Sequence, residues 1–583
     1  MADSWPRRAF LAAVFVLLGA CLLKKIVDYD IWYHLVVGRE VARAWRVPGV
    51  EFYVYPLLGS PAHFFEYGFG LLFFETHRLL GYGGMSVLNA VLAATTLFVL
   101  YRTAAIRQEE SPGPLLLLVP LLWLTNGRMV YRPEVCLYLA LAAEIYALER
   151  HAAGGSSRWL AAVPALTFLL ASLHPSSLIL LMVLALYLAQ GLVSEPRTLR
   201  AALLRLRDFG VAGAAGVLAS AVNPHGFEPL VLPLKFATEE RLLSATLEFQ
   251  PTMGTSQAPI LLLLCAIAIP AVLVPKGRRV VGAGMVLLFG FLAFRHVRNI
   301  ALLALVTYVP VARALDAVLR RIPRLVDRPG RIAGRAGALA LLGLALVVTA
   351  RSPAWGWGVA EERFPVRSAA LIAASKPPGR IVNYPHMGGY LAWRLYDDYL
   401  VATDGRHYLG WDASLALVDD VFGAGERWQD LVRQHEVTMV VSPGVIEGSG
   451  WVVPLLVVLD ADEGWSLVQE EPAALLLMRT EVARQAGIPI LSKDLIWEHV
   501  LADARRMLPG DRITGPRLAL SVGMALLELR LFEDSEPWLS HFLQATPDDA
   551  WAQRMLALVR ATRQGDPEAR LVLENMYGRA DPR

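Results

Sequence analysis

The chain has 583 residues, of which 55% are hydrophobic and only 18% are charged. A typical soluble domain carries about 25% charged residues, so this composition argues against an ordinary soluble protein and equally against disorder. The net charge of +3 gives no reason to expect a nucleic-acid partner, and the three cysteines are too few for a disulfide framework or a zinc site. The class that remains is a multi-pass membrane protein.

Apolar runs long enough to cross a bilayer recur along the first part of the chain and then stop. Because a membrane-spanning helix needs about 20 mostly apolar residues, we predict about eleven transmembrane helices. They are expected at 8–24, 84–101, 114–126, 133–149, 159–173, 176–193, 209–223, 258–274, 280–294, 299–317 and 337–351. The first run has no small-residue cleavage site after it, so we interpret it as an anchor and not as a signal peptide.

The distribution of Lys and Arg predicts the orientation of these helices. With the N-terminus in the cytoplasm, the inside loops include 197–207, 276–279 and 320–335, and their density of basic residues is roughly twice that of the outside loops. The segment 66–82 is apolar but carries charged side chains, and the bias would reverse if it crossed the membrane. We therefore predict an interfacial helix on the outer face there.

Three domains are expected. Residues 1–351 form the transmembrane domain, with a long first outer loop at 25–83 and a second at 223–257. Strand-like and helix-like segments alternate in 352–483, which predicts a small extracytoplasmic α/β domain. Residues 484–583 are amphipathic helices similar to tetratricopeptide repeats, interpreted either as a capping bundle or as a partner-binding domain.

The α/β segment can be divided further. Strands are expected at 379–384, 398–406 and 437–443, helices at 390–396 and 426–435, and a hairpin near 465–480. The turn expected at 385–389 lacks both the Walker lysine and the three-glycine spacing of a phosphate-binding loop. Nucleotide binding at this turn is therefore not predicted.

The first chemistry-bearing cluster, DYDIWYH at 28–34, directly follows the first predicted span. A helix beginning near Asp28 would place Asp30 and His34 on one face, at the i, i+4 spacing of an oriented base or a metal pair. Asp28 is equally well interpreted as a helix cap, so its role stays open. For Asp30 we favour a functional role.

Other polar residues are placed at the ends of later spans. Glu134 either takes part in a functional site or only interacts with the positive end of a helix dipole. His174 is either a residue of the membrane interface or a metal ligand. The turn RHVRN at 295–299 is either a structural turn at the lipid headgroups or a phosphate site, because arginine binds phosphate through two hydrogen bonds. The supporting residues that we single out are Arg132, Glu134, His225 and Glu248.

This pattern resembles the GT-C superfamily of integral membrane glycosyltransferases. The string DYDIWYHL at 28–35 matches Asp-x-Asp-x-Trp-x-His-Leu, which bacterial multi-pass proteins of this group carry near the first span. The resemblance extends over nearly the whole chain, including NPHG at 223–226, GGYL at 388–391 and the tetratricopeptide-like tail. It implies a protein of the bacterial inner membrane with a cytoplasmic N-terminus and extracytoplasmic C-terminal domains.

The resemblance also implies transfer of a sugar from a polyprenyl-phosphate donor to a lipid, glycan or protein acceptor. Such a reaction needs a carboxylate to deprotonate the acceptor and cations to hold the departing phosphate. Asp30, with Asp28 as second choice, would be the base, and the residues that would bind the donor phosphate are Arg295, Arg298 and His296. A divalent metal ion is an open alternative, with Asp30 and His34 together with Glu134 or His174 as ligands.

Two other classes of function stay open. A non-catalytic membrane assembly protein would keep the fold, use the tail to recruit a protein partner and have no need of Asp30. A glycan polymerase or transporter is the third class. A transporter should show inverted repeats and broken helices near mid-membrane, whereas the polar residues here gather at one face.

The topology leads to a first prediction. An alkaline phosphatase fused near residue 480 should be active in a bacterial host, and a green fluorescent protein fused at the same place should stay dark. The reason is that an odd number of spans carries the tail across the membrane. Fluorescence of the green fluorescent protein fusion, with an inactive alkaline phosphatase fusion, would show that the predicted orientation is wrong.

Overall fold

The computed structural model describes residues 4–106, 112–194, 198–236, 247–273, 279–322, 328–406, 420–446, 449–507 and 514–577. Parts of the predicted cytoplasmic loops and residues 237–246 of the second outer loop lie outside these ranges. The chain divides into two compact units. The first contains Met1–Gly49 and His63–Ala360, and the second contains Val50–Ala62 and Glu361–Arg583. A short part of the first predicted outer loop is therefore grouped with the tail.

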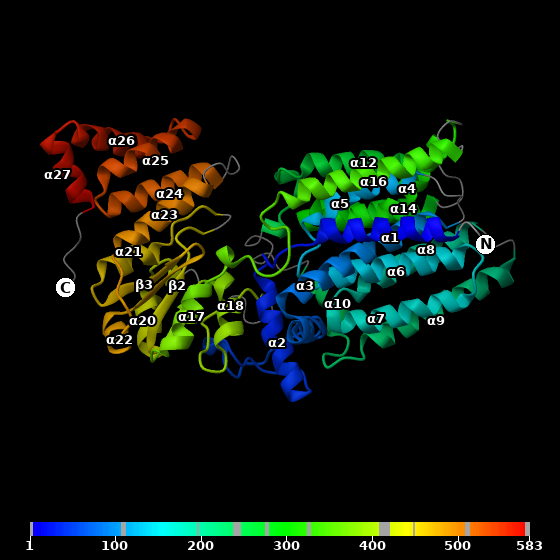
Figure 1. The fold of residues 1–583 in the computed structure, drawn as a ribbon, viewed down its shortest axis with the longest axis horizontal. Helices are drawn as coiled ribbons and strands as arrows, with labels where there is room; N and C mark the ends of the chain where they lie inside the picture. Colours follow the sequence, from blue (N-terminus) through cyan, green and yellow to red (C-terminus); the bar gives the residue numbers. More distant parts are fainter. Residues whose placement is uncertain are drawn as a thin grey trace. The chain divides into compact units, whose positions relative to one another are not determined.

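The first unit is a bundle of helices (Figure 1). Its α-helices are α1 (Ser4–Leu22), α2 (Asp30–Ala44), α3 (Tyr67–Ala104), α4 (Pro112–Leu116), α5 (Leu118–Asn126), α6 (Glu134–Ala152), α7 (Ala162–Leu173), α8 (Ser177–Ser194), α9 (Leu199–Ser220), α10 (Glu228–Phe236), α12 (Ala258–Leu273), α13 (Arg279–Arg295), α14 (Ile300–Leu319) and α16 (Arg328–Ala350). Short 3₁₀ helices connect them, namely η2 (Ser157–Ala161), η3 (Leu247–Phe249), η4 (Thr252–Gly254) and η5 (Val297–Asn299).

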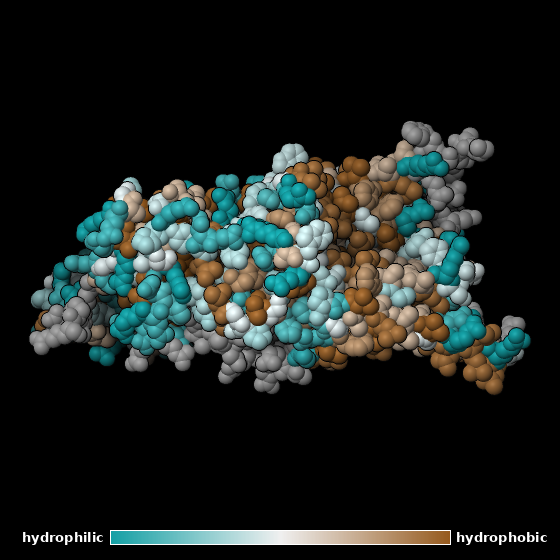
Figure 2. Space-filling view, turned by 90° about the horizontal axis from the view of Figure 1, so that it is seen from below, coloured by the Kyte–Doolittle hydropathy of each residue, from teal (hydrophilic) through white to brown (hydrophobic). Residues whose placement is uncertain are grey.

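Every predicted span coincides with a helix or, at 114–126, with the pair α4 and α5. Helices α9 and α16 begin about ten residues before the predicted spans, because their first turns are basic and helical without being apolar. Among the described helices, three are long and apolar enough to cross a membrane: Tyr67–Ala104, Val297–Leu319 and Ile332–Ala350. Shorter apolar helices accompany them, and apolar side chains cover much of the face of this unit that Figure 2 shows. The number of spans stays a prediction.

Helix α3 covers both the predicted interfacial segment at 66–82 and the span at 84–101. The two parts are separated by a kink at Gly81, whose φ of 65° lies in the left-handed region that favours glycine. The division expected from the charged residues therefore appears as a bend in one helix.

Helix α2, which begins with the predicted catalytic residue Asp30, crosses α3 at very short range. A Cβ atom on Gly38 would lie 2.2 Å from the Gly70 carbonyl oxygen, and one on Gly70 would lie 2.4 Å from the His34 carbonyl oxygen. Only glycine allows two helix backbones to approach this closely. The contact fixes the position of α2 against the bundle.

The second unit contains a four-stranded mixed sheet with the order β1-β2-β4-β3. The strands are β1 (Arg380–Asn383), β2 (Val437–Ser442), β3 (Trp465–Glu471) and β4 (Ala474–Arg479). Strands β1 and β2 are parallel, with Ile381 opposite Met439, and β4 is antiparallel to both of its neighbours. The central strands are almost entirely buried, as expected for a sheet covered on both faces.

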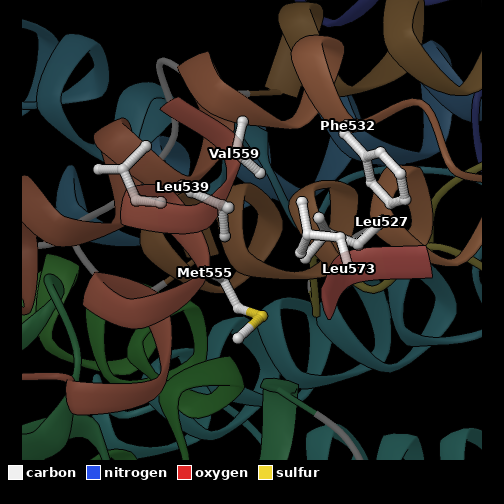
Figure 3. Close-up of a cluster of buried hydrophobic side chains, with 7 residues drawn as sticks. Leu527, Phe532, Leu539, Met555, Val559 and Leu573 are labelled. Carbon is white, nitrogen blue, oxygen red and sulfur yellow. The ribbon is translucent and has the colours of Figure 1, made fainter. Parts of the chain in front are cut away.

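Helices cover this sheet and form the rest of the tail. They are α17 (Val366–Ser375), α18 (Pro385–Leu395), α20 (Glu426–Gln434), α21 (Pro454–Ala461), α22 (Thr480–Gln485), α23 (Asp494–Met507), α24 (Thr514–Glu528), α25 (Phe532–Ala545), α26 (Ala550–Arg563) and α27 (Pro567–Met576), with the 3₁₀ helices η1 (Tyr55–Leu57) and η6 (Glu361–Arg363). Consecutive helices from α24 to α27 pack on one another. Leu527, Leu539, Met555 and other apolar residues form their shared core (Figure 3). The similarity to tetratricopeptide repeats stays a prediction.

Two local predictions in the α/β part are wrong. The turn expected at 385–389 is the first part of α18, because Pro385 occupies the first helical turn, where proline is well tolerated. The strand expected at 398–406 is an irregular segment with a single bridge, between Val401 and Val54. Its backbone hydrogen-bonds to a side chain instead: Asn383 accepts from the Ala402 amide and donates to the Thr403 carbonyl.

A buried ion network links Val50–Ala62 to the sheet. Arg406 donates to Glu51 at 2.8 Å and to Asp404 at 2.7 Å, and its guanidinium carbon lies 4.5 Å from the centre of the Tyr53 ring. The other carboxylate oxygen of Glu51 accepts the backbone amides of Tyr53 and Val54. All of these charged side chains are buried, so each depends on its partners for compensation.

Arg406→Met should destabilise the second unit by about 3–5 kcal/mol, because it leaves the carboxylates of Glu51 and Asp404 buried without a cation. Thermal or denaturant unfolding of the purified protein measures this change. Lys376→Met is the matched control, since it removes an exposed ion pair with Asp398 and should cost no more than about 1 kcal/mol. Equal losses in the two variants would contradict a structural role for Arg406.

Candidate active site

Four separate parts of the first unit meet in one cluster of charged side chains. They are the segment after α1, the connection between α5 and α6, η3 and η5. Salt bridges join the residues of this cluster, which we call the charged cluster: Asp28, Asp30, Arg128, Arg132, Glu134, Glu248 and Arg298.

The segment after α1 is extended and held by backbone hydrogen bonds. The Lys25 amide donates to the Ala354 carbonyl and the Ile26 amide to the Gly358 carbonyl, both at 2.8 Å. The Tyr131 hydroxyl donates to the Lys24 carbonyl from the other side. These contacts bring the chain to the start of α2 in a defined position, with its two aspartates near the connection between α5 and α6.

Asp28 contacts both the start of α2 and the charged cluster. Its Oδ1 accepts the backbone amide of Asp30 at 2.9 Å, which is a cap-like contact at the start of α2. Its Oδ2 accepts from Nε of Arg132 at 2.7 Å. The side chain therefore both begins the helix and belongs to the charged cluster.

The turn at 295–299 packs against η3 and positions Arg298. The Val297 amide donates to the Gln250 carbonyl at 3.1 Å, and Nδ1 of His296 donates to the Phe249 carbonyl at 2.7 Å. The guanidinium carbon of Arg298 lies 4.8 Å from the centre of the Phe249 ring, a cation–π distance. Arg298 is thereby directed to Glu134, to which it donates at 2.5 Å.

Arg132 and Glu134 are the two centres of the charged cluster. Arg132 contacts three carboxylates: Asp28 at 2.7 Å, Glu248 at 2.5 Å and Asp30 at the longer distance of 3.4 Å. One oxygen of Glu134 accepts from both Arg128 and Arg298. The Glu134 side chain is only 10% exposed, whereas Asp30 and Glu248 are about 30% exposed and can reach a ligand.

The charged cluster contains one more carboxylate than guanidinium groups, and Asp30 is the carboxylate with the longest ion pair. Burial raises the pKa of Asp30 to about 7, and Asp28 and Glu248 add to this effect, while Arg132 opposes it. The Arg132 guanidinium is shared with Asp28 and Glu248, which it contacts at shorter distances. For Glu248, burial is outweighed by Arg128 and Arg132, which hold its pKa at about 2.

His174 lies at the C-terminal end of α7, close to the charged cluster. Burial lowers its pKa to about 4, although the charge of Glu134 acts in the opposite direction. The imidazole is therefore neutral at pH 7, and it can accept a hydrogen bond or bind a metal ion.

Besides His174, four predicted residues lie outside the charged cluster. Arg295 is exposed at the end of α13, and none of the described contacts joins it to the cluster. His296 faces the backbone of Phe249. His34 is buried edge-on against the Phe69 ring at 5.0 Å. His225 belongs to another group of side chains, described next.

His225 lies beside two residues that we did not select from the sequence, His63 and Glu228. One possible ligand atom of each of the three residues lies within 4.8 Å of those of the other two. Among the described residues, this is the one group of three with that property. It contains neither His34 nor His174, the histidines proposed above as metal ligands. His63 gave no sequence signal beyond being a histidine in an aromatic stretch.

Arg128 stands with Arg132 and Glu134 between two predicted spans, but it was not among the selected site residues. It contacts Glu134 at 2.7 Å and Glu248 at 2.8 Å. Its spacing from Arg132 is one helical turn, but no regular helix connects the two positions, so periodicity alone gave no reason to choose it.

No protein-family model and no curated protein sequence matches this chain. Solved structures do match it. Archaeal oligosaccharyltransferase AglB from Archaeoglobus fulgidus, in complex with an inhibitory peptide and a dolichol-phosphate, aligns with a TM-score of 0.50 at 13% identity over 80% of this chain and 74% of its own.

Two further structures align slightly below that score. ArnT from Cupriavidus metallidurans in the apo state has a TM-score of 0.48 at 12% identity, over 82% of this chain and 98% of its own. Arabinofuranosyltransferase AftD from Mycobacteria has a TM-score of 0.49 at 16% identity, over 81% of this chain and 41% of its own. At these identities the likeness concerns the fold. Over about 80% of its length, the chain has a fold similar to that of the archaeal oligosaccharyltransferase.

Proposed function

We propose that this protein is a membrane glycosyltransferase that moves a sugar from a polyprenyl-phosphate donor to an acceptor on the extracytoplasmic side, with inversion. The observation that carries the proposal is the charged cluster, in which four distant chain segments place an accessible carboxylate beside several arginines. The fold supports it, since the solved oligosaccharyltransferase with this fold was bound to a dolichol-phosphate.

Asp30 has the properties of a general base. It begins a helix held rigidly against α3, it is accessible, and its pKa of about 7 lies near the working pH, where general bases are most effective. The other carboxylates of the charged cluster make shorter ion pairs than Asp30 does. Asp30 is therefore a better base than Asp28, whose two oxygens are used by the Asp30 amide and Arg132.

Arg298 is the arginine best suited to the donor phosphate. Its guanidinium group is about a quarter exposed and is held by Glu134 and the Phe249 ring. In the proposed step, Asp30 takes the proton of the acceptor hydroxyl while the oxygen of that hydroxyl attacks the anomeric carbon of the donor sugar. The bond from that carbon to the phosphate oxygen breaks, and the phosphate leaves with the bonding electrons beside Arg298.

Asp30→Asn should lower turnover by about 10²–10⁴-fold, the usual contribution of a general base. In a host that lacks the gene, polyprenyl-phosphate sugars should accumulate, as measured by mass spectrometry of lipid extracts, and the wild type but not Asp30→Asn should remove them. Asp430→Asn makes the same chemical change on an exposed helix of the second unit and should behave as wild type. Full complementation by Asp30→Asn would favour the non-catalytic assembly protein.

The ionisation of Asp30 should also set the pH dependence of turnover. Because the pKa of Asp30 is raised to about 7, the anion that accepts the proton predominates only above that pH. The turnover of wild-type protein in proteoliposomes containing the lipid extract should rise from pH 5.5 to about 8 and then level off. A turnover rate that is constant over this pH range would show that the ionisation of Asp30 does not control the rate, and would exclude Asp30 as the general base.

Substitution of the two arginines in the 295–299 turn should affect kcat/KM to different extents. Arg298→Gln should reduce kcat/KM by about 10²–10³-fold, as expected when one preorganised electrostatic contact is removed. Arg295→Gln should have a much smaller effect, since this exposed side chain lies outside the charged cluster. The comparison uses initial rates in the same proteoliposomes, and the reverse order of effects would transfer the phosphate-binding role to Arg295.

A further inference from the structure

The group formed by His63, His225 and Glu228 shares no residue with the charged cluster. His63 comes from the first long loop, His225 from the turn after α9, and Glu228 is the first residue of α10. Nδ1 of His63 lies 2.8 Å from Oε2 of Glu228. The two imidazole rings are stacked, with centres 5.4 Å apart and planes at 27°.

The His225 ring has one hydrogen-bonded nitrogen and one without a partner among the described residues. The Phe64 backbone hydrogen-bonds its ring, while Nε2 is buried and has no hydrogen-bond partner among the described residues. The Phe64 contact therefore uses Nδ1 and fixes the tautomer in which Nε2 carries a lone pair. Metal-binding histidines are commonly oriented by such a backbone contact at their other nitrogen.

The turn that carries His225 is fixed as well. Oδ1 of Asn223 accepts the His225 amide at 2.8 Å, and its Nδ2 donates to the carbonyls of Ser220 and Gly226. This side chain thus closes the turn after α9 and sets the direction of the imidazole. A fixed turn lowers the entropy cost of holding a ligand in place.

A buried nitrogen lone pair without a donor, beside a second imidazole and a carboxylate, fits a cation better than it fits a purely structural contact. Two imidazoles and one carboxylate are a common ligand set for zinc, with one position left for water or a substrate oxygen. Tetrahedral bonds of about 2.0–2.2 Å place ligand atoms roughly 3.3 Å apart. Small side-chain rotations bring atoms that now lie within 4.8 Å to that spacing.

We infer that His63, His225 and Glu228 form a binding site for a first-row divalent transition-metal ion, with Zn²⁺ as the best chemical match. Bound there, the ion joins the first long loop to the turn after α9 and the start of α10. It replaces the hydrogen bond between His63 and Glu228. Lys235 lies 3.4 Å from the other Glu228 oxygen. The inference does not depend on the proposed glycosyl transfer.

The test measures metal content without any sugar donor. Full-length protein without a polyhistidine tag is stripped with a chelator, equilibrated with ZnCl₂, desalted and analysed for zinc by mass spectrometry. The wild type should retain about one zinc per chain, and His63→Asn and His225→Asn should each weaken binding at least about 10-fold, as expected for loss of a ligand. His541→Asn, on α25 of the second unit, should bind like the wild type.

A second measurement needs no variant. X-ray absorption at the zinc edge of the wild-type protein should show two imidazole ligands and additional oxygen ligands. The inference is overturned if the stripped wild type takes up no zinc, or if the bound zinc has no imidazole ligands. It is also overturned if Asp30→Asn loses the ion while His225→Asn keeps it, because the metal would then lie in the charged cluster.

Discussion

Arg132 is the side chain on which the arrangement of the candidate active site depends. Its guanidinium group contacts carboxylates from three parts of the chain: Asp28 and Asp30 at the start of α2, and Glu248 in η3. Without this cation the carboxylates would face one another at short range in a partly buried place, which is strongly unfavourable. The positions of α2 and η3 relative to α6 therefore follow from the need to compensate these charges.

Incomplete compensation gives the charged cluster its chemical character. Burial raises the pKa of Asp30 although Arg132 opposes it, whereas at Glu248 the charges of Arg128 and Arg132 outweigh burial and lower the pKa. Groups of like charge in one site usually separate in this way, one becoming a strong acid and the other a usable base. One fold region can thus hold a permanent anion and a proton acceptor side by side.

The network around Arg406 in the second unit is a useful contrast. There Glu51 and Asp404 are fully paired with the guanidinium group, the Tyr53 hydroxyl donates to Asp404, and every charged member is buried. No carboxylate is left poorly paired and none is accessible, so the network stabilises the packing of Val50–Ala62 against the sheet. Accessibility and unequal pairing, more than the residue types, distinguish the charged cluster from this buried network.

The local pattern of the sequence was enough for the secondary structure, because hydrophobic periodicity and chain composition act within one element. All predicted spans coincide with helices, and β1, β2 and the hairpin of β3 and β4 lie where alternation placed them. Errors arose where distant residues supplied the backbone's partners, as at 398–406, where the side chain of Asn383 replaces a neighbouring strand.

The sequence alone predicted the membrane class, the helices and most of the candidate site residues, including Asp30, Arg132, Glu134 and Arg298. Only the tertiary structure decided which of them share a site. It joined Arg128 to the charged cluster, left Arg295 outside it, and brought His63 from one loop to His225 at the end of another helix. The physical reason is that ion pairing and metal ligation depend on distances of a few ångströms between segments far apart in the chain, and no local pattern records those distances.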